Sequence, residues 1–480
     1  MDEKAAPYIP DDVYPLHVLD HNPVYVDWVM RFNDVLDADM LKKSLSRLLE
    51  IGDWRKLGGR YRYKPDGKLE IFCPGSSAGD RENVSFTHEV IDSNILAHPV
   101  ASKLPLKTDG PSVQTLEPNF RPFDGRLNFP KFEELTKHDI PPISVHVTSF
   151  NDATIVALSW PHHLMDAMGG KALLSAWSLV LAGQEEEVPE VVGAREDILK
   201  NPEITAENDE EFALGKSRMG GIGLLLFQVR FLWDCLWNGS REKKVIYIPK
   251  ETFKKIEDQV KEDIAANVSG VETAPWVTEN DILVSWMGRV FATTEQSSRP
   301  ITILNFLNLR FRVPLLLRTP GILLQNICVG TYTFLSAAVA RGPVGQIALE
   351  NRRHTAQQGT DEQGRRFMMS IYKDIEEGRT PHLFYGPITG VVLLVNNVIK
   401  IELIKTVDFA PAVIRTGEDS KTRKNPLGSM VSYYNAYLDG MYDALNTLVM
   451  YGKDHADNYW IGGALLPRAW KAIDEALKKL

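Results

Sequence analysis

Residues 154–170 read Thr-Ile-Val-Ala-Leu-Ser-Trp-Pro-His-His-Leu-Met-Asp-Ala-Met-Gly-Gly and join two different patterns. The β-branched and apolar run at 154–158 predicts a buried strand. Residues 171–182, in which apolar side chains recur at helical spacing, predict a helix. Two histidines and an aspartate therefore lie where a strand ends and a helix begins. The glycines that close the segment, Gly169 and Gly170, allow backbone or ligand to come close.

The chemistry available at this junction is general base catalysis. A neutral imidazole can take a proton from a hydroxyl or an amine near neutral pH. Asp166 follows His162 by four residues and could orient the ring or hold the loop. The same residues could also be two hydrogen-bonded histidines at a strand end beside a surface aspartate, because so short a motif often occurs without a function. We expect no metal site, since no Cys or Glu nearby completes a tetrahedral set of ligands.

Composition narrows the class of protein. The 480 residues are enough for two large domains or three small ones. A net charge of −9 argues against a nucleic-acid partner. The three cysteines are far apart and form neither a disulfide framework nor a zinc spacing, which fits a reducing compartment. The acidic, polar start is unlike a signal peptide, so we expect a cytoplasmic protein.

The chain changes character between its two halves. Acidic runs at 184–190 and 207–211 contain breaker residues, and we interpret them as a solvated linker. A strand at 243–250 then opens the second half. We therefore expect an N-terminal domain at 1–185, a crossover segment at 186–242 and a C-terminal domain at 243–480.

One apolar segment requires a membrane check. Residues 219–229 carry no charge, but Arg230 and Asp234 interrupt the apolar pattern at a spacing typical of a helical ion pair. We favour a buried or interface helix, because a helix that is apolar all round is usually buried. The alternative is peripheral membrane contact through the aromatic side chains Phe227, Phe231, Trp233 and Trp237.

The His162–Asp166 motif resembles the His-x-x-x-Asp-Gly signature of the BAHD family of acyl-CoA-dependent acyltransferases. Other segments resemble the family in the same order, and together they span nearly the whole chain. They are 14–20, 56–61, 278–287, 308–314, 325–326, 342–352 and 406–412. The departures are Ala167 in place of glycine, and Ala410-Pro411-Ala412 where the family carries Gly-Trp-Gly. We identify a divergent member of fungal type.

The resemblance implies an α/β fold of two similar chloramphenicol-acetyltransferase-like domains, with open mixed sheets and a tunnel between the domains. Acyl-CoA is then a co-substrate, a small molecule is the acceptor, and no cofactor is bound permanently. His162, which has the four-residue spacing to Asp166 that His163 lacks, would deprotonate an acceptor hydroxyl or amine for attack on the thioester carbonyl. Lys250 is a candidate contact for CoA phosphates. We expect a monomer.

The resemblance also implies which residues support the site. In the family the motif aspartate turns away from the tunnel and pairs with an arginine. Arg310 and Arg312 are the candidates for Asp166, and we select Arg312. Asp408 and Phe409 fall in the second family motif, where the aspartate pins the loop that shapes the CoA side.

Two alternatives remain open. The chain could be a condensation-type enzyme that uses carrier-protein thioesters, because such domains share the fold and a His-His-x-x-x-Asp motif. It could also be a relative of the same fold that has lost acyl transfer and binds or converts a hydrophobic metabolite. The altered second motif keeps this last alternative open.

Overall fold

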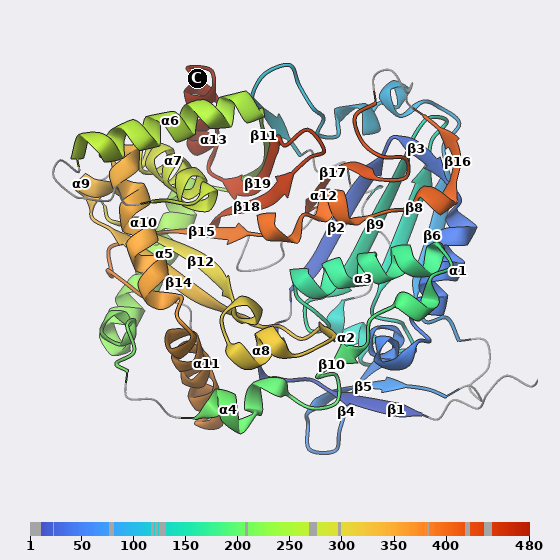
Figure 1. Ribbon diagram of the computed structural model, residues 1–480. Helices are drawn as coiled ribbons and strands as arrows, with labels where there is room; N and C mark the ends of the chain where they lie inside the picture. Colours follow the sequence, from blue (N-terminus) through green and yellow to red (C-terminus); the bar gives the residue numbers. More distant parts are fainter. Residues whose placement is uncertain are drawn as a thin grey trace, which may run out of the picture.

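The computed structural model describes residues 11–22, 24–75, 81–116, 120, 123, 131–206, 210–267, 276–295, 299–379, 381, 384–417, 423–435 and 444–480. Two open mixed sheets organise this part of the chain, one in each half of the molecule (Figure 1). The α/β class and the mixed sheets expected from the sequence are confirmed.

The first sheet has five strands in the order β17-β2-β9-β8-β6. Its central strand β9 is buried at every position, as its β-branched sequence predicts. Helix α3 follows β9 directly and packs beside α1, whose N-cap is Asp37. The elements of this half are β2 Tyr25–Phe32, α1 Ala38–Leu48, β6 Ser85–Val90, α2 Phe132–Leu135, β8 Ser144–Ser149, β9 Thr154–Pro161, α3 Ala167–Leu181 and β17 Met430–Asn435.

The second sheet has seven strands in the order β14-β12-β15-β18-β19-β11-β7. Strand β15 runs parallel to both β12 and β18, and the remaining pairs are antiparallel. These strands are β7 Ser112–Thr115, β11 Glu242–Ile248, β12 Ile301–Asn308, β14 Cys328–Leu335, β15 Val391–Asn397, β18 Asn446–Lys453 and β19 Tyr459–Leu465.

Helices pack around the second sheet (Figure 1). Helix α10 contacts α6 and α7, and α13 contacts α7. The long helices are α5 Gly221–Asn238, α6 Lys250–Asn267, α7 Glu279–Thr294, α10 Val344–Gln358, α11 Asp361–Glu376 and α13 Pro467–Leu477. The short ones are α4 Pro202–Thr205, α8 Pro314–Arg318, α9 Ala337–Ala340 and α12 Leu403–Thr406.

Three smaller sheets complete the strand pairing. The first has the order β1-β5-β4, and the others pair β10 with β13 and β16 with β3. Their strands are β1 Asp12–Pro15, β3 Asp34–Leu36, β4 Arg60–Tyr63, β5 Leu69–Cys73, β10 Val191–Val192, β13 Ile322–Leu323 and β16 Val413–Thr416.

The two halves exchange strands, so boundaries at 185 and 243 do not separate two self-contained sheets. Strand β7, from the first half of the sequence, pairs with β11 at the edge of the seven-stranded sheet. Strands β16 and β17, from the second half, pair with β3 and β2. The edge strands of each sheet thus come partly from the other half of the chain, which leaves fewer unpaired edges.

The crossover segment is more than a solvated linker. Its acidic run at Glu185–Glu187 has no buried residue. Further along, Leu199, Ile204 and Leu214 are buried in a cluster with residues of the second half. The segment is therefore anchored by apolar burial as well as by the β10–β13 pairing.

Helix α5 is not buried, which contradicts the first of the two placements expected for it, a buried or an interface helix. Phe227 is its one buried residue. Among the described helices, none is long and apolar enough to cross a membrane. Apolar residues of this helix therefore face the surface. Trp233 and Trp237 are exposed, as the alternative of peripheral membrane contact requires, whereas Phe227 is buried.

Candidate active site

The segment between β9 and α3 carries both histidines and ends in a well-formed helix cap. Asp166 is the N-cap of α3, and its Oδ1 accepts hydrogen bonds from the backbone N–H groups of Met168 at 3.0 Å and Gly169 at 3.1 Å. A Cβ at Gly169 would lie 2.6 Å from the Met165 Cβ and 3.0 Å from the Leu324 carbonyl oxygen. Gly169 is therefore needed for close packing at this turn.

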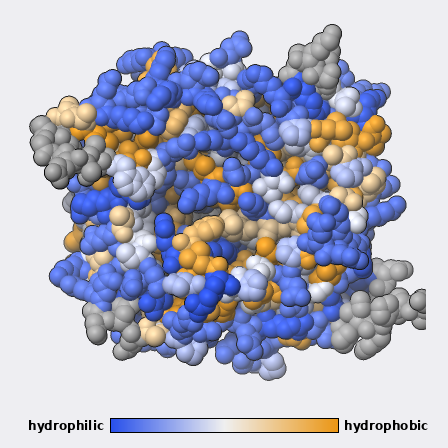
Figure 2. Space-filling view, in the orientation of Figure 1, coloured by the Kyte–Doolittle hydropathy of each residue, from blue (hydrophilic) through white to orange (hydrophobic). Residues whose placement is uncertain are grey.

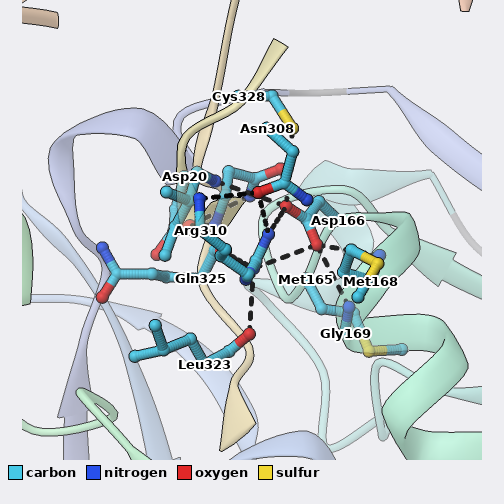
Figure 3. A network of polar contacts seen from close by, with 12 residues as sticks. Asp20, Met165, Asp166, Met168, Gly169, Asn308, Arg310, Leu323, Gln325 and Cys328 are labelled. Carbon is cyan, nitrogen blue, oxygen red and sulfur yellow. Dashed lines mark hydrogen bonds and ion pairs between the residues drawn. The ribbon is translucent and has the colours of Figure 1, made fainter. Parts of the chain in front are cut away.

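Asp166 pairs with Arg310, so the prediction that Arg312 is its partner is wrong. Arg310 donates from Nη1 to Asp166 Oδ2 at 2.6 Å and from Nη2 to Oδ1 at 3.1 Å. Both side chains are nearly buried, whereas Arg312 is exposed. Figure 3 shows the pair at the centre of its network, where Arg310 also donates to the carbonyl oxygens of Leu323 and Gln325. This fork-to-fork geometry joins the two halves of the molecule.

The backbone of His162 is held from two sides. Its N–H donates to the Val24 carbonyl oxygen at 2.7 Å, and its own carbonyl accepts from Asn326 Nδ2 at 2.9 Å. Asn326 is in turn fixed by Asp20, whose Oδ1 accepts from both the Asn326 backbone and its side chain. Both Asp20 and Asn326 are buried.

Sequence reasoning assigned no role to Asp20 or Asn326. Both lie in segments that resemble the family, 14–20 and 325–326. That resemblance was the available signal, but nothing in the sequence shows that the two residues meet across 306 positions.

The two histidines occupy different environments. His163 is 6% exposed and stacks on Phe132 with ring centroids 4.4 Å apart, while Tyr61 meets it edge to face. Burial lowers the pKa of His163 to about 3, with smaller contributions from His21 and His162. His163 is therefore neutral near pH 7 and a very weak base. His162 is half-buried and lacks such an aromatic enclosure among the described residues.

We expect the buried His163 to make folding sensitive to acid. Its pKa is about 3 in the folded chain against 6.5 for the ordinary group. Below pH 6.5 the unfolded chain binds a proton that the folded chain does not, so the free energy of unfolding falls by up to ~1.4 kcal/mol per pH unit. His163→Phe keeps a ring against Phe132 and removes this dependence. Urea unfolding at neutral pH and at about pH 5 gives the change in the free energy of unfolding with pH for each protein. The same change in the parent protein and in His163→Phe would contradict the assignment.

The second family motif places Phe409 in the core of the first half and Asp408 at the surface. Phe409 is fully buried and packs between Phe32, at 5.5 Å, and Trp177, at 4.8 Å. Asp408 is exposed, and its Oδ1 accepts from the Ala410 N–H at 3.0 Å, while its own N–H donates to Ser178 Oγ. Ser178 is twelve residues beyond Asp166, roughly 18 Å along α3. Asp408 therefore holds its own turn at the end of α3 remote from the histidines.

The remaining predicted contact, Lys250, is the first residue of α6. Its Nζ lies 3.6 Å from Asp457, and its side chain is 63% exposed. No described contact joins it to His162 or Asp166.

The described residues favour neither a cysteine nucleophile nor a metal ion at the site. Cys328 lies beside Asp166, with Sγ 3.8 Å from Oδ2, and burial raises the pKa of its thiol well above the usual range. The thiol is thus not a ready nucleophile. Among the described residues, no cluster of His, Cys, Asp or Glu could hold a metal ion. Nδ1 of His162 and Nδ1 of His163 are buried without a described hydrogen-bond partner, as are Nε of Arg310 and Oε1 of Gln325.

Comparison with known proteins gives full-length matches. The chain is 34% identical to the O-acetyltransferase PaAT-2 of Phomopsis amygdali, with 98% of each chain covered. It is 32% identical to the acetyltransferase BOT5 of Botryotinia fuckeliana, covering 99% of this chain and 92% of that one. Among solved structures, TRI101 of F. sporotrichioides in complex with coenzyme A and T-2 superposes with a TM-score of 0.64 at 14% identity, over 98% of both chains. No protein-family model matches.

Proposed function

We propose, because this chain belongs to the BAHD-type family of fungal acyltransferases, that His162 is the general base of acyl transfer from acyl-CoA to a small-molecule acceptor. The observation that carries the assignment is the contrast between the two histidines. His163 is enclosed by aromatic rings with a pKa of about 3, whereas His162 is half-buried on a clamped backbone. A base must be both reachable and able to hold a proton near working pH.

The proposed reaction is one displacement at a thioester. His162 takes the proton from the acceptor as the acceptor oxygen attacks the thioester carbonyl carbon, and a tetrahedral oxyanion forms. The carbon–sulfur bond then breaks, and the protonated imidazole returns its proton to the leaving CoA thiolate. The products are the acylated acceptor and free CoA, so atoms and charge balance without a further reagent.

We propose a hydroxyl as the acceptor group and secondary metabolites as the acceptor class. Support comes from PaAT-2, which is named an O-acetyltransferase, and from the CoA and T-2 complex of TRI101. Figure 2 shows apolar side chains gathered near the middle of the face that lies between the two halves, which suits an apolar acceptor.

Asp166 acts as a positioning residue in this proposal. Its two carboxylate oxygens are taken up by Arg310 and by the first N–H groups of α3. It therefore fixes where β9 ends and α3 begins, and so where His162 stands, without touching the imidazole. Asp20 and Asn326 act in the same way on the His162 carbonyl.

We expect acetyl-CoA to bind and to be cleaved with release of a free thiol. Calorimetry with CoA and acetyl-CoA tests binding without any need to know the acceptor. Thiol release in the presence of a panel of terpenoid and other apolar alcohols then tests transfer. His162→Ala is the matched control: it should bind acetyl-CoA like the parent protein and release little thiol.

Two results would count against the proposal. Absence of CoA or acyl-CoA binding at millimolar concentration favours a relative that has lost acyl transfer. Thiol release only from an acylated carrier protein favours the condensation-type enzyme. For either result, the first candidate cause is the segment Ala410-Pro411-Ala412, which departs most from the family.

A further inference from the structure

Helix α5 is amphipathic, but its orientation is the reverse of that of an ordinary surface helix. Asp234 and Asn238 face the protein, and a row of apolar side chains faces outward. Asp234 Oδ2 accepts from Arg299 Nη1 at 2.6 Å, and Asn238 Oδ1 accepts from Arg468 at 2.7 Å. On the same side Phe227 is buried and its ring lies 5.0 Å from that of Phe384. The helix is therefore anchored by one aromatic contact and two part-buried polar contacts.

The opposite side of α5 is an uninterrupted apolar stripe, hereafter the α5 stripe. Its residues recur at spacings of three and four and fall within an arc of about 140° at 3.6 residues per turn. All are more than half exposed: Ile222 77%, Leu225 59%, Leu226 53%, Val229 56%, Leu232 60%, Trp233 62%, Leu236 83% and Trp237 73%. The rings of Trp233 and Trp237 stack on each other with centroids 6.0 Å apart.

Within the described part of the chain, no element covers this stripe. Burying one large apolar side chain contributes roughly 1.5–3 kcal/mol, and here eight of them gain little of it. Contiguous apolar patches of this extent on a monomer mark sites that contact a partner or a membrane. Figure 1 places α5 at the periphery, toward the left edge of the view.

We propose that the α5 stripe rests on the surface of a phospholipid bilayer, with α5 lying in the plane of the interface. The charges around the stripe favour this partner. Asp234 is the one acidic residue of α5, and it faces inward in its pair with Arg299. The exposed Gln228 and Arg230 border the stripe on its two sides, where they meet headgroups. Tryptophan side chains are typical of the boundary between headgroups and acyl chains, and α5 presents two of them on the stripe.

Among the described residues, the surface beside α5 offers no apolar groove for the stripe of a second copy. A bilayer receives a convex apolar helix without a groove, whereas a second copy would have to pack stripe against stripe, an outcome that light scattering distinguishes. The shallow hollow beside α5 is lined by charged side chains that include Arg241, Glu295 and Arg468. Inserting the stripe there would bury those charges against apolar atoms.

Flotation with phosphatidylcholine vesicles that contain some phosphatidylserine tests the proposal. The parent protein should float with the vesicles, and the fluorescence of Trp233 and Trp237 should shift to shorter wavelength. The double substitution Trp233→Ser/Trp237→Ser should weaken partitioning on the order of a hundredfold or more, because two large apolar side chains no longer enter the interface. Both positions are exposed, so the fold should persist.

The matched control is Ile414→Ser, which removes an apolar side chain that is 67% exposed on β16, away from α5. It should leave flotation unchanged. Failure of the parent protein to float, or equal loss in the control, overturns the proposal. So does a dimer in light scattering that the tryptophan double variant dissociates, which would assign the stripe to a second copy. Calorimetry with acetyl-CoA should be unchanged in the variant, which keeps this result separate from the proposed function.

Discussion

His162→Ala is expected to lower the rate of acyl transfer ~10²–10⁴-fold, the usual contribution of a positioned general base. The variant should fold normally, because the contacts that hold His162 use its backbone N–H and carbonyl rather than the ring. The measurement is product formation at equal folded concentration, with melting curves recorded beside it. Binding of acetyl-CoA should be retained.

His163 provides the control for this substitution. His163→Ala should keep most of the activity, since an imidazole stacked on Phe132 with a pKa of about 3 cannot serve as the base. The larger His163→Phe retains a ring in the stack and separates a packing effect from a chemical one. Near-normal turnover by His162→Ala with inactive His163 variants would move the base to His163. Activity in both would contradict base-assisted transfer altogether.

Arg310→Ala is expected to destabilise the fold by roughly 3–5 kcal/mol, because it leaves the Asp166 carboxylate buried without its charge partner. The carboxylate then keeps the helix-cap hydrogen bonds and a longer one from the Ile327 N–H at 3.3 Å. The arginine side chain is 10% exposed and the aspartate 7%. The substitution also leaves the carbonyl oxygens of Leu323 and Gln325 without their donor. Urea unfolding at neutral pH measures the change in the free energy of unfolding.

Arg312→Ala is the matched control, two residues away and of the same type. Its exposed side chain predicts a change within about 0.5 kcal/mol. Asp166→Asn keeps the cap oxygen and removes the charge, so it should destabilise in the same direction as Arg310→Ala. The double variant should be more stable than the sum of the two losses predicts, because the partners are coupled. Equal effects of the two arginine substitutions would contradict the structural assignment.

The sequence pattern around the His162–Asp166 motif correctly predicts the secondary structure on both sides of it. A β-branched run predicts a buried strand at 154–158, and β9 is buried throughout. Helical spacing predicts a helix from residue 171, and α3 begins four residues earlier because Asp166 caps it. The order of family-like segments indicated the α/β fold, which the strand pairing confirms.

The sequence does not predict the partner of Asp166 or the orientation of α5, because both depend on contacts between distant segments. The choice between Arg310 and Arg312 follows from the turn after β12, where Asn308 Oδ1 accepts the Arg310 N–H at 2.9 Å. A helical pattern at α5 shows that one face is apolar, yet which face meets the protein depends on Arg299 and Arg468. Periodicity reports one element at a time, so it carries no information on the surface that an element meets.

The strand, turn and helix that carry His162 follow from local sequence, since propensity, periodicity and capping act within a few residues. Which of the two adjacent histidines is enclosed depends on long-range contacts, because Phe132 and Tyr61 reach His163 from remote segments. The tertiary structure also decided the anchoring of His162 through Asp20 and Asn326, and the exchange of β7, β16 and β17 between the sheets. Burial and long-range pairing depend on how distant segments meet, and burial and pairing in turn set the pKa of a side chain and the orientation of a helix.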